Sequence, residues 1–153
     1  MSTPNHLAPE RLLALRSETV HSKKRLFEQA AASISAEFDL DQESAYRSLL
    51  SREKLGSTAI GHGVAIPHSR MRGCSEPLGC LILLSEGIDF GAPDGADVEI
   101  AFILLVPEAA TQDHLDLLAS LANAFSSADI RDRLKKADSA GDARLALLEG
   151  LGL

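Results

Sequence analysis

The sequence predicts a single α/β domain in which helices flank a small, mostly buried β-sheet. Two continuous apolar runs, Leu78–Leu84 and Val98–Val106, are rich in leucine, isoleucine and valine, as expected of strands covered on both faces. Elsewhere, apolar residues recur at helical spacing. A chain of 153 residues has the size of one ordinary domain and buries a core without disulfide or metal support.

The N-terminal region predicts a loose segment, an edge strand and a helix. Residues 1–10 are polar with two prolines and are expected to be loose, which leaves residues 11–150 as the domain. Leu12–Val20 predicts an edge strand. Ser22 is the expected cap of the following helix. The buried stripe of that helix is Leu26, Phe27, Ala30, Ala31, Ile34 and Phe38.

A second helix is expected to follow closely. Asp39 precedes Gln42 by three residues, as in a capping box, and an apolar stripe follows. The pattern ends between Arg52 and Leu55, just before Gly56. Arg52 is therefore predicted to lie in the last helical turn, where the helix dipole favours a cation.

The next stretch ends in a short apolar run, Val64–Ile66, that Pro67 is expected to stop, because proline has no backbone N–H for a strand ladder. This predicts His68 on a loop at a strand end. Small residues before it permit tight turns and leave amides and hydroxyls free to meet an anion. They are Gly56, Ser57, Thr58, Gly61 and Gly63.

The C-terminal third predicts three helices. Thr111 is the expected cap of the first, which spans Gln112–Phe125. Serine-initiated capping patterns at Ser126 and Ser139 predict two further short helices, which end near Gly150. The expected buried face of the first helix is Leu115, Leu118, Ala122 and Phe125.

Composition narrows the classes of function. The net charge of −7 argues against nucleic-acid binding, which needs a basic footprint, and allows partners that carry a basic patch. Cys74 and Cys80 are six residues apart, and there is no second cysteine cluster. We therefore expect neither a disulfide nor a zinc site, and we expect both cysteines to act as small hydrophobic side chains. Free cysteines fit a reducing cytoplasm. No secretory signal or run of about 20 apolar residues is evident, so a cytoplasmic protein without membrane insertion is expected.

His68 is the candidate centre of chemistry. A neutral imidazole supplies a lone pair for nucleophilic attack, and the guanidinium of Arg52 can bind two phosphoryl oxygens in fork geometry. A lone histidine in a loop is more often a surface or hydrogen-bonded residue. The preceding Pro67 and the glycine-rich loop favour a phosphoryl acceptor here.

The stretch L-G-S-T-A-I-G-H-G-V-A-I-P-H, residues 55–68, resembles the active-site signature of the enzyme IIA proteins of the bacterial phosphotransferase system, fructose/mannitol class, and most of all their nitrogen-regulatory branch. Weaker similarity runs from about residue 12 to residue 148. Ala59 and His62 stand where a glycine and a variable small residue are more usual. The resemblance implies a mixed sheet. It also implies that His68 is phosphorylated on Nε2, and that Arg52 and His114 shape its site.

Further side chains are candidates for the same site. His114 is expected at about the third residue of its helix, where the helix N-terminus attracts anions, so that it donates an N–H to the phosphoryl group. Ser57, Thr58 and Ser69 are candidate phosphate-binding donors. The alternative for His114 is a half-buried structural histidine. The alternative for the three hydroxyl residues is a local turn hydrogen bond, which serine and threonine make routinely.

No metal or other cofactor is expected. His62, His68 and His114 lack a carboxylate or cysteine in ligand spacing. His6, His21 and His62 are interpreted as surface residues.

The resemblance implies a phosphoryl relay in which His68 accepts from an HPr- or NPr-like phosphocarrier. Its phosphorylation state would then signal to regulatory targets such as kinases or ion transporters, so that the chain acts mainly as a regulator. One alternative is a sugar-specific enzyme IIA that passes the group to an enzyme IIB; another is a protein-binding module without transfer. The surface around His68 is expected to be apolar, with Ile66 and Met71 nearby.

Overall fold

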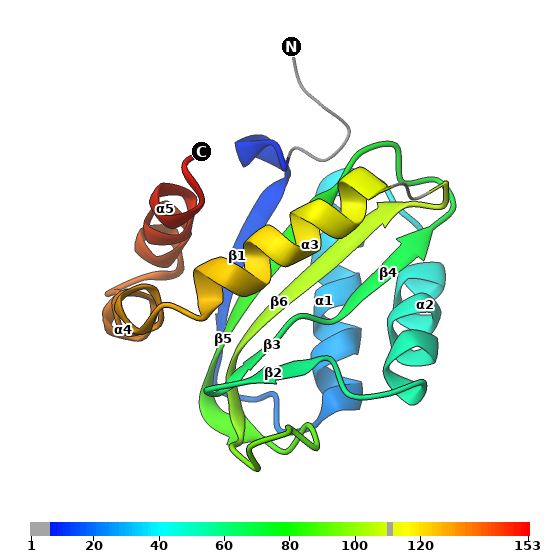
Figure 1. The fold of residues 1–153 in the computed structure, drawn as a ribbon. Coiled ribbons are helices and arrows are strands. Elements are labelled where there is room, and N and C mark those ends of the chain that lie inside the picture. The colour runs from blue at the N-terminus through cyan, green and yellow to red at the C-terminus, as the bar shows by residue number, and fades with distance from the viewer. Residues whose placement is uncertain (1–6, 110–111) are drawn as a thin grey trace.

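One mixed six-stranded sheet organises the fold in the computed structural model, which describes residues 7–109 and 112–153 (Figure 1). Five α-helices pack on it, so the predicted fold class is confirmed. The strands are β1 (Leu12–Ser17), β2 (Ala59–Gly61), β3 (Val64–Ala65), β4 (His68–Met71), β5 (Leu78–Ile88) and β6 (Val98–Pro107). The helices are α1 (Lys23–Phe38), α2 (Gln42–Lys54), α3 (Gln112–Phe125), α4 (Ala128–Lys136) and α5 (Ala140–Leu151).

The strand order is β1-β5-β6-β3-β2, and β4 also pairs with β6. Strand β1 lies at an edge, as predicted, parallel to β5, while β5 and β6 are antiparallel. Strands β3 and β4 both run parallel to β6 and follow one another along it, separated only by Ile66 and Pro67. The short strand β2, which sequence reasoning missed, pairs with β3.

The prediction that His68 lies on a loop is wrong, because His68 is the first residue of β4. Pro67 has no N–H to donate, but its carbonyl accepts a hydrogen bond from the Leu104 N–H at 2.8 Å. Pairing with β6 resumes at His68, which lies opposite Leu104. The proline therefore interrupts the ladder without ending the strand.

Helices cover both faces of the sheet, with α1 and α2 on one side and α3, α4 and α5 on the other (Figure 1). Alternate residues of β5 divide between the two layers: Cys80 and Ile82 pack with α1 and α2, and Leu81 and Leu83 pack with the other helices. This two-sided burial explains the continuous apolar runs. Both cysteines are free and buried, as expected, and burial raises the pKa of the Cys80 thiol to about 12.

Two of the predicted helix caps are confirmed. The Ser22 side chain accepts from the Arg25 N–H at the start of α1, and the Ser139 side chain accepts from the Asp142 N–H at the start of α5. The expected Thr111 cap lies outside the described residues.

Two other cap predictions were wrong. Helix α2 is capped by Asp41, while Asp39 ends α1 in the left-handed conformation with φ of 56°. Helix α4 is capped by Ser127 and not by Ser126. In both places a neighbouring residue of the same capping class has the extended backbone that an N-cap requires.

The buried face of α3 also differs from the prediction. Phe125 is fully buried, as predicted, but Leu121 is fully buried as well, and Leu115 is 57% exposed. At the other end of the chain, Leu7 is buried against the α5 side of the core, and Pro9–Arg11 form a short 3₁₀ helix. Leu7 therefore packs with the core at the N-terminal end of the described residues. In the described part of the chain, no helix is long and apolar enough to cross a membrane.

Gly79 on β5 offers a test of the packing around Phe102 of β6, whose ring centroid lies 5.8 Å from that of Phe125 on α3. A Cβ placed there would lie 2.4 Å from Cζ of Phe102. We expect Gly79→Ala to lower the free energy of unfolding by about 1–3 kcal/mol through overpacking, measured by urea denaturation. Gly141→Ala is the control, because its Cβ would meet only Ser139 Oγ at 3.7 Å within helix α5, so its stability should stay equal or rise. Equal stability of both variants would contradict this packing.

Candidate functional site

The predicted site residues surround one hollow region between α2, β4 and α3. A groove of about 820 Å³ is lined by Arg52, His68, Ser69 and His114 among others. An adjoining cavity of about 370 Å³ is lined by Arg52 and His68 together with Ser57 and Thr58. His68 and Arg52 belong to both, so the fold brings the other five candidates around the imidazole of His68.

The imidazole of His68 is held in a defined orientation by its own backbone. Nδ1 lies 2.7 Å from the carbonyl oxygen of Ile66, two residues earlier. A carbonyl only accepts hydrogen bonds, so Nδ1 carries the proton and donates. The other nitrogen, Nε2, is left with its lone pair, which makes it the nucleophilic atom of the ring.

The electrostatics of the site keep this ring neutral. Burial is the main cause that lowers the pKa of His68, and the positive charge of Arg52 acts in the same direction. The hydrogen bond to Ile66 and the negative charge of Glu53 oppose these effects without reversing them. A lowered pKa keeps the lone pair available at neutral pH.

Arg52 lies in the last turn of α2, as predicted, with its side chain half-buried. Its Nη1 donates to the carbonyl of Gly56 at 2.8 Å, which anchors the loop that follows the helix. A guanidinium has five N–H donors in a fork, so this bond leaves others for an anion next to His68.

A buried carboxylate that sequence reasoning did not single out holds the loop in place. Glu53 is 8% exposed and forms an ion pair with Lys23 at 2.9 Å. It also accepts from the Thr58 hydroxyl at 2.6 Å and from the Thr58 N–H at 3.2 Å. These contacts join the start of α1, the end of α2 and the loop. No local sequence pattern predicts these contacts, because Lys23 lies 30 residues from Glu53 in the chain.

The three hydroxyl candidates differ in what they already bind. The Thr58 hydroxyl proton is committed to Glu53. Ser69 Oγ donates to the Arg70 carbonyl at 3.2 Å, a local bond. Ser57 Oγ accepts from the Ala59 N–H at 3.2 Å, which leaves the Ser57 O–H as a donor beside the cavity. Ser57 and Ser69 thus make local turn hydrogen bonds, while the Thr58 hydroxyl binds a carboxylate of the preceding helix.

His114 is the third residue of α3 and is buried, with 7% of its surface exposed, where it lines the groove. The expected apolar surface is present but is made by other residues than predicted. Ile66 and Met71 are buried at 1% and 4%. The exposed apolar side chains around the site are instead Leu55, Leu115 and Ile60, at 85%, 57% and 39%.

The remaining histidines lie elsewhere. His62 is exposed at the tip of the β2–β3 hairpin with φ of 58°, and its N–H donates to Asp94 Oδ2 at 2.9 Å. It lines neither cavity around His68. His21 is exposed as well, and His6 lies outside the described residues. Within residues 7–109 and 112–153, no three His, Cys, Asp or Glu side chains gather as a metal site would require.

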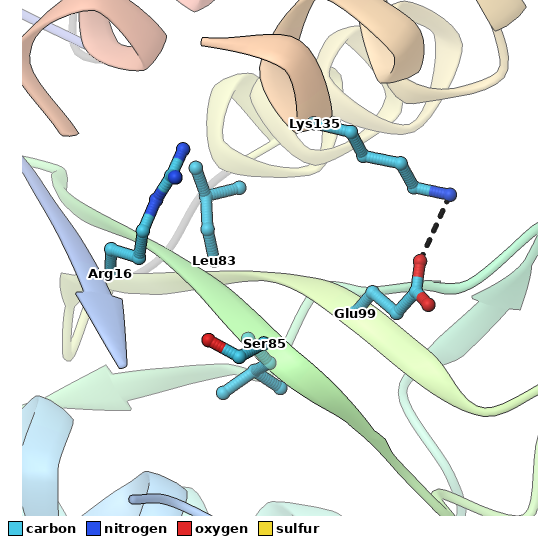
Figure 2. A pocket seen from close by; sticks show the side chains of 6 residues that line it. Arg16, Leu83, Ser85, Glu99 and Lys135 are labelled. Carbon is cyan, nitrogen blue, oxygen red and sulfur yellow. Dashed lines mark ion pairs between the residues drawn. The ribbon is translucent and has the colours of Figure 1, made fainter. Parts of the chain in front are cut away.

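A smaller cavity of about 250 Å³ lies where α4 meets the sheet (Figure 2). Its charged groups are bound to other protein groups: Lys135 pairs with Glu99 at 3.0 Å, and Arg16 donates to the Ala137 carbonyl at 2.6 Å. These bonds tie α4 to β6 and β1. The cavity is therefore explained by the packing of α4 on the sheet.

The chain matches one family model, described as "Phosphoenolpyruvate-dependent sugar phosphotransferase system, EIIA 2", over residues 8–149. A relative from Pseudomonas aeruginosa named "Nitrogen regulatory protein" is 48% identical over 120 residues, which cover 78% of each chain. A protein of the same name from Bradyrhizobium diazoefficiens is 39% identical over 130 residues, which cover 84% of this chain and 83% of that protein.

Solved structures agree with these sequence matches. The nitrogen regulatory protein IIA-Ntr from Neisseria meningitidis superposes with a TM-score of 0.81 at 44% identity, covering 92% of this chain and 94% of that one. IIA mannitol from Escherichia coli superposes with a TM-score of 0.71 at 20% identity, covering 95% and 99%. The second comparison shows a shared fold alone.

The contacts of Glu53 predict that removal of the Thr58 hydroxyl lowers the free energy of unfolding. Thr58→Val keeps the shape of the side chain but removes the proton donated to a buried carboxylate. We expect the free energy of unfolding to fall by about 1–3 kcal/mol, measured by urea denaturation. Ser57→Ala, at the exposed neighbour, should stay within about 0.5 kcal/mol of the parent chain. If Thr58→Val were as stable as Ser57→Ala, the anchoring role of Glu53 would be disproved.

The state of the His68 ring can be read directly by ¹⁵N NMR. We expect the Nδ1–H tautomer and a pKa below the value of about 6.5 of an unfolded chain. Because the native ring binds protons less readily, its contribution to stability is complete above about pH 6.5 and is lost as the pH falls towards its native pKa. A ring that titrates above 6.5, or an Nε2–H tautomer, would contradict the geometry.

Proposed function

Because the chain belongs to the phosphotransferase system EIIA type 2 family, we propose that Nε2 of His68 accepts a phosphoryl group from a phosphohistidine of an HPr- or NPr-like carrier. We further propose that residues 11–150 act as one EIIA domain and that regulatory partners read the phosphorylation state of His68.

The observation that carries the proposal is the hydrogen bond between His68 Nδ1 and the Ile66 carbonyl. This bond leaves Nε2 as the ring nitrogen with a lone pair, and His68 lines the groove. In the transfer, Nε2 forms a bond to phosphorus while the bond from phosphorus to the carrier's imidazole nitrogen breaks, and that nitrogen keeps the electron pair. The atoms and electrons of this step balance without an oxidant or a metal. The protein contributes position and charge on the phosphoryl oxygens.

Arg52 and His114 have complementary roles in this scheme. The remaining guanidinium donors of Arg52 bind phosphoryl oxygens and neutralise their charge. His114, near the N-terminus of α3, donates an N–H from the opposite wall of the groove. Ser57 is the hydroxyl with a proton left to donate. Exposed Leu55 and Leu115 give a docking carrier apolar surface to bury.

A regulatory role is supported by relatives named nitrogen regulatory protein. A phosphoryl group would bring about −1.5 to −2 charges into the groove and so change which protein surfaces fit there. Candidate targets are kinases or ion transporters, with an enzyme IIB as the partner if the group is passed on.

Intact-mass analysis after incubation with phosphoenolpyruvate, enzyme I and an HPr-type carrier tests the relay. We expect one acid-labile phosphoryl adduct, absent from His68→Ala. His114→Gln and Arg52→Lys should accept the group about tenfold more slowly or worse, because each removes an aligned donor.

His21→Gln is the matched control, since His21 is exposed and lines neither cavity around His68, and its rate should not change. A folded parent chain that takes no phosphoryl group from any carrier, or an adduct retained by His68→Ala, would refute the assignment.

A further inference from the structure

Strand β4 has a free edge. It pairs with β6 on one side, and no strand in the described part of the chain pairs with its other side (Figure 1). The Pro67 carbonyl bonds to β6, so backbone groups of alternate residues from Pro67 point to β6. The N–H and C=O of His68 and Arg70 therefore point outward. In keeping with this, the Arg70 carbonyl accepts from the Ser69 hydroxyl.

The groove beside His68 passes over this edge. Helix α2 covers one face of the sheet and α3 the other, yet residues of both line the groove together with all of His68–Arg70. A hollow bounded by helices from opposite faces has to cross the edge between them. Unpaired strand edges bind extended peptides through main-chain hydrogen bonds.

The charge of the groove is opposite to that of the chain. The protein has a net charge of −7, but the groove contains Arg52 and Arg70, and no carboxylate is present among the described side chains that line it. The exposed side chain of Arg70 makes no hydrogen bond or ion pair with residues 7–109 or 112–153. Apolar side chains, among them Leu115 and Leu118, form the α3 wall.

We propose that the edge of β4 binds an extended segment of a partner protein in which apolar and acidic side chains alternate. The segment adds a strand through the outward backbone groups of His68 and Arg70. Its carboxylates pair with Arg70 and Arg52, and its apolar side chains cover Leu115. A second copy of this chain fits poorly, because pairing β4 with β4 would bring the two Arg70 side chains together.

Binding of this segment does not require the proposed phosphoryl transfer. Only its release rests on that function: a phosphoryl group on His68 would repel the carboxylates of the segment within the same groove. The segment and the phosphocarrier then compete for one surface, which goes beyond the relay itself.

The probe is a labelled seven-residue peptide that alternates leucine with glutamate, titrated into the unphosphorylated protein. We expect saturable binding with a Kd on the order of 100 µM or tighter. A version with lysine for glutamate, and one with N-methyl groups on alternate backbone amides, should each bind at least about tenfold more weakly.

Arg70→Glu should weaken the peptide about tenfold or more, whereas Arg47→Glu, an equal charge reversal on the exposed surface of α2, should not. Amide hydrogen exchange should slow at His68 and Arg70 and stay unchanged at Ser69 and Met71. Binding that ignores Arg70→Glu and N-methylation, or protection at other elements, would overturn the proposal. So would concentration-dependent dimerisation that protects the same amides.

Phosphorylated protein should bind the peptide about tenfold more weakly. If the protein takes no phosphoryl group, the proposed function fails while the peptide results on unphosphorylated protein stand. If transfer occurs but the peptide does not bind, only the docking inference fails.

Discussion

The interruption of the sheet at Ile66 and Pro67 is the constraint on which the site depends. A proline without an N–H separates two short strands that pair with the same partner, β6. At this break the Ile66 carbonyl accepts from His68 Nδ1, two residues along, which fixes the imidazole tautomer. Because β6 is buried on both faces, the strand that carries His68 is paired with a well-packed part of the fold.

The buried polar groups around this break form one connected arrangement. Glu53 has three hydrogen bonds, from Lys23 and from both donor groups of Thr58, so burial of its charge is compensated. The same contacts fix the loop that carries Ser57 and joins α2 to β2. Buried ion pairs contribute little net stability but strongly disfavour arrangements in which one partner is lost. The contacts therefore specify one loop conformation.

Sequence patterns predicted the helices and the central strands because these follow from local periodicity, and a long motif supports His68 as the proposed acceptor. The predictions failed where several residues could occupy the same cap position, or where a contact or the burial of a side chain depends on distant parts of the chain. Asp39 and Asp41 are equally good caps by type, and only the backbone angles select Asp41. Leu115 has helical spacing but lines the groove, where 57% of its surface is exposed. Glu53 was missed because its partner Lys23 belongs to a different helix.

The charge of the groove beside His68 is opposite to the net charge of the chain, and this difference decides what the groove can bind. The net charge of −7 repels an acidic partner at long range, but salt screens that repulsion beyond about 8–10 Å. Among the described side chains that line the groove, Arg52 and Arg70 carry the fixed charges and no carboxylate is present. An anion that reaches contact distance is therefore attracted, whether it is a phosphoryl group or a carboxylate. In our proposals both ligands use Arg52, so occupancy by one would lower the affinity for the other, and the groove would couple phosphoryl transfer at His68 to docking.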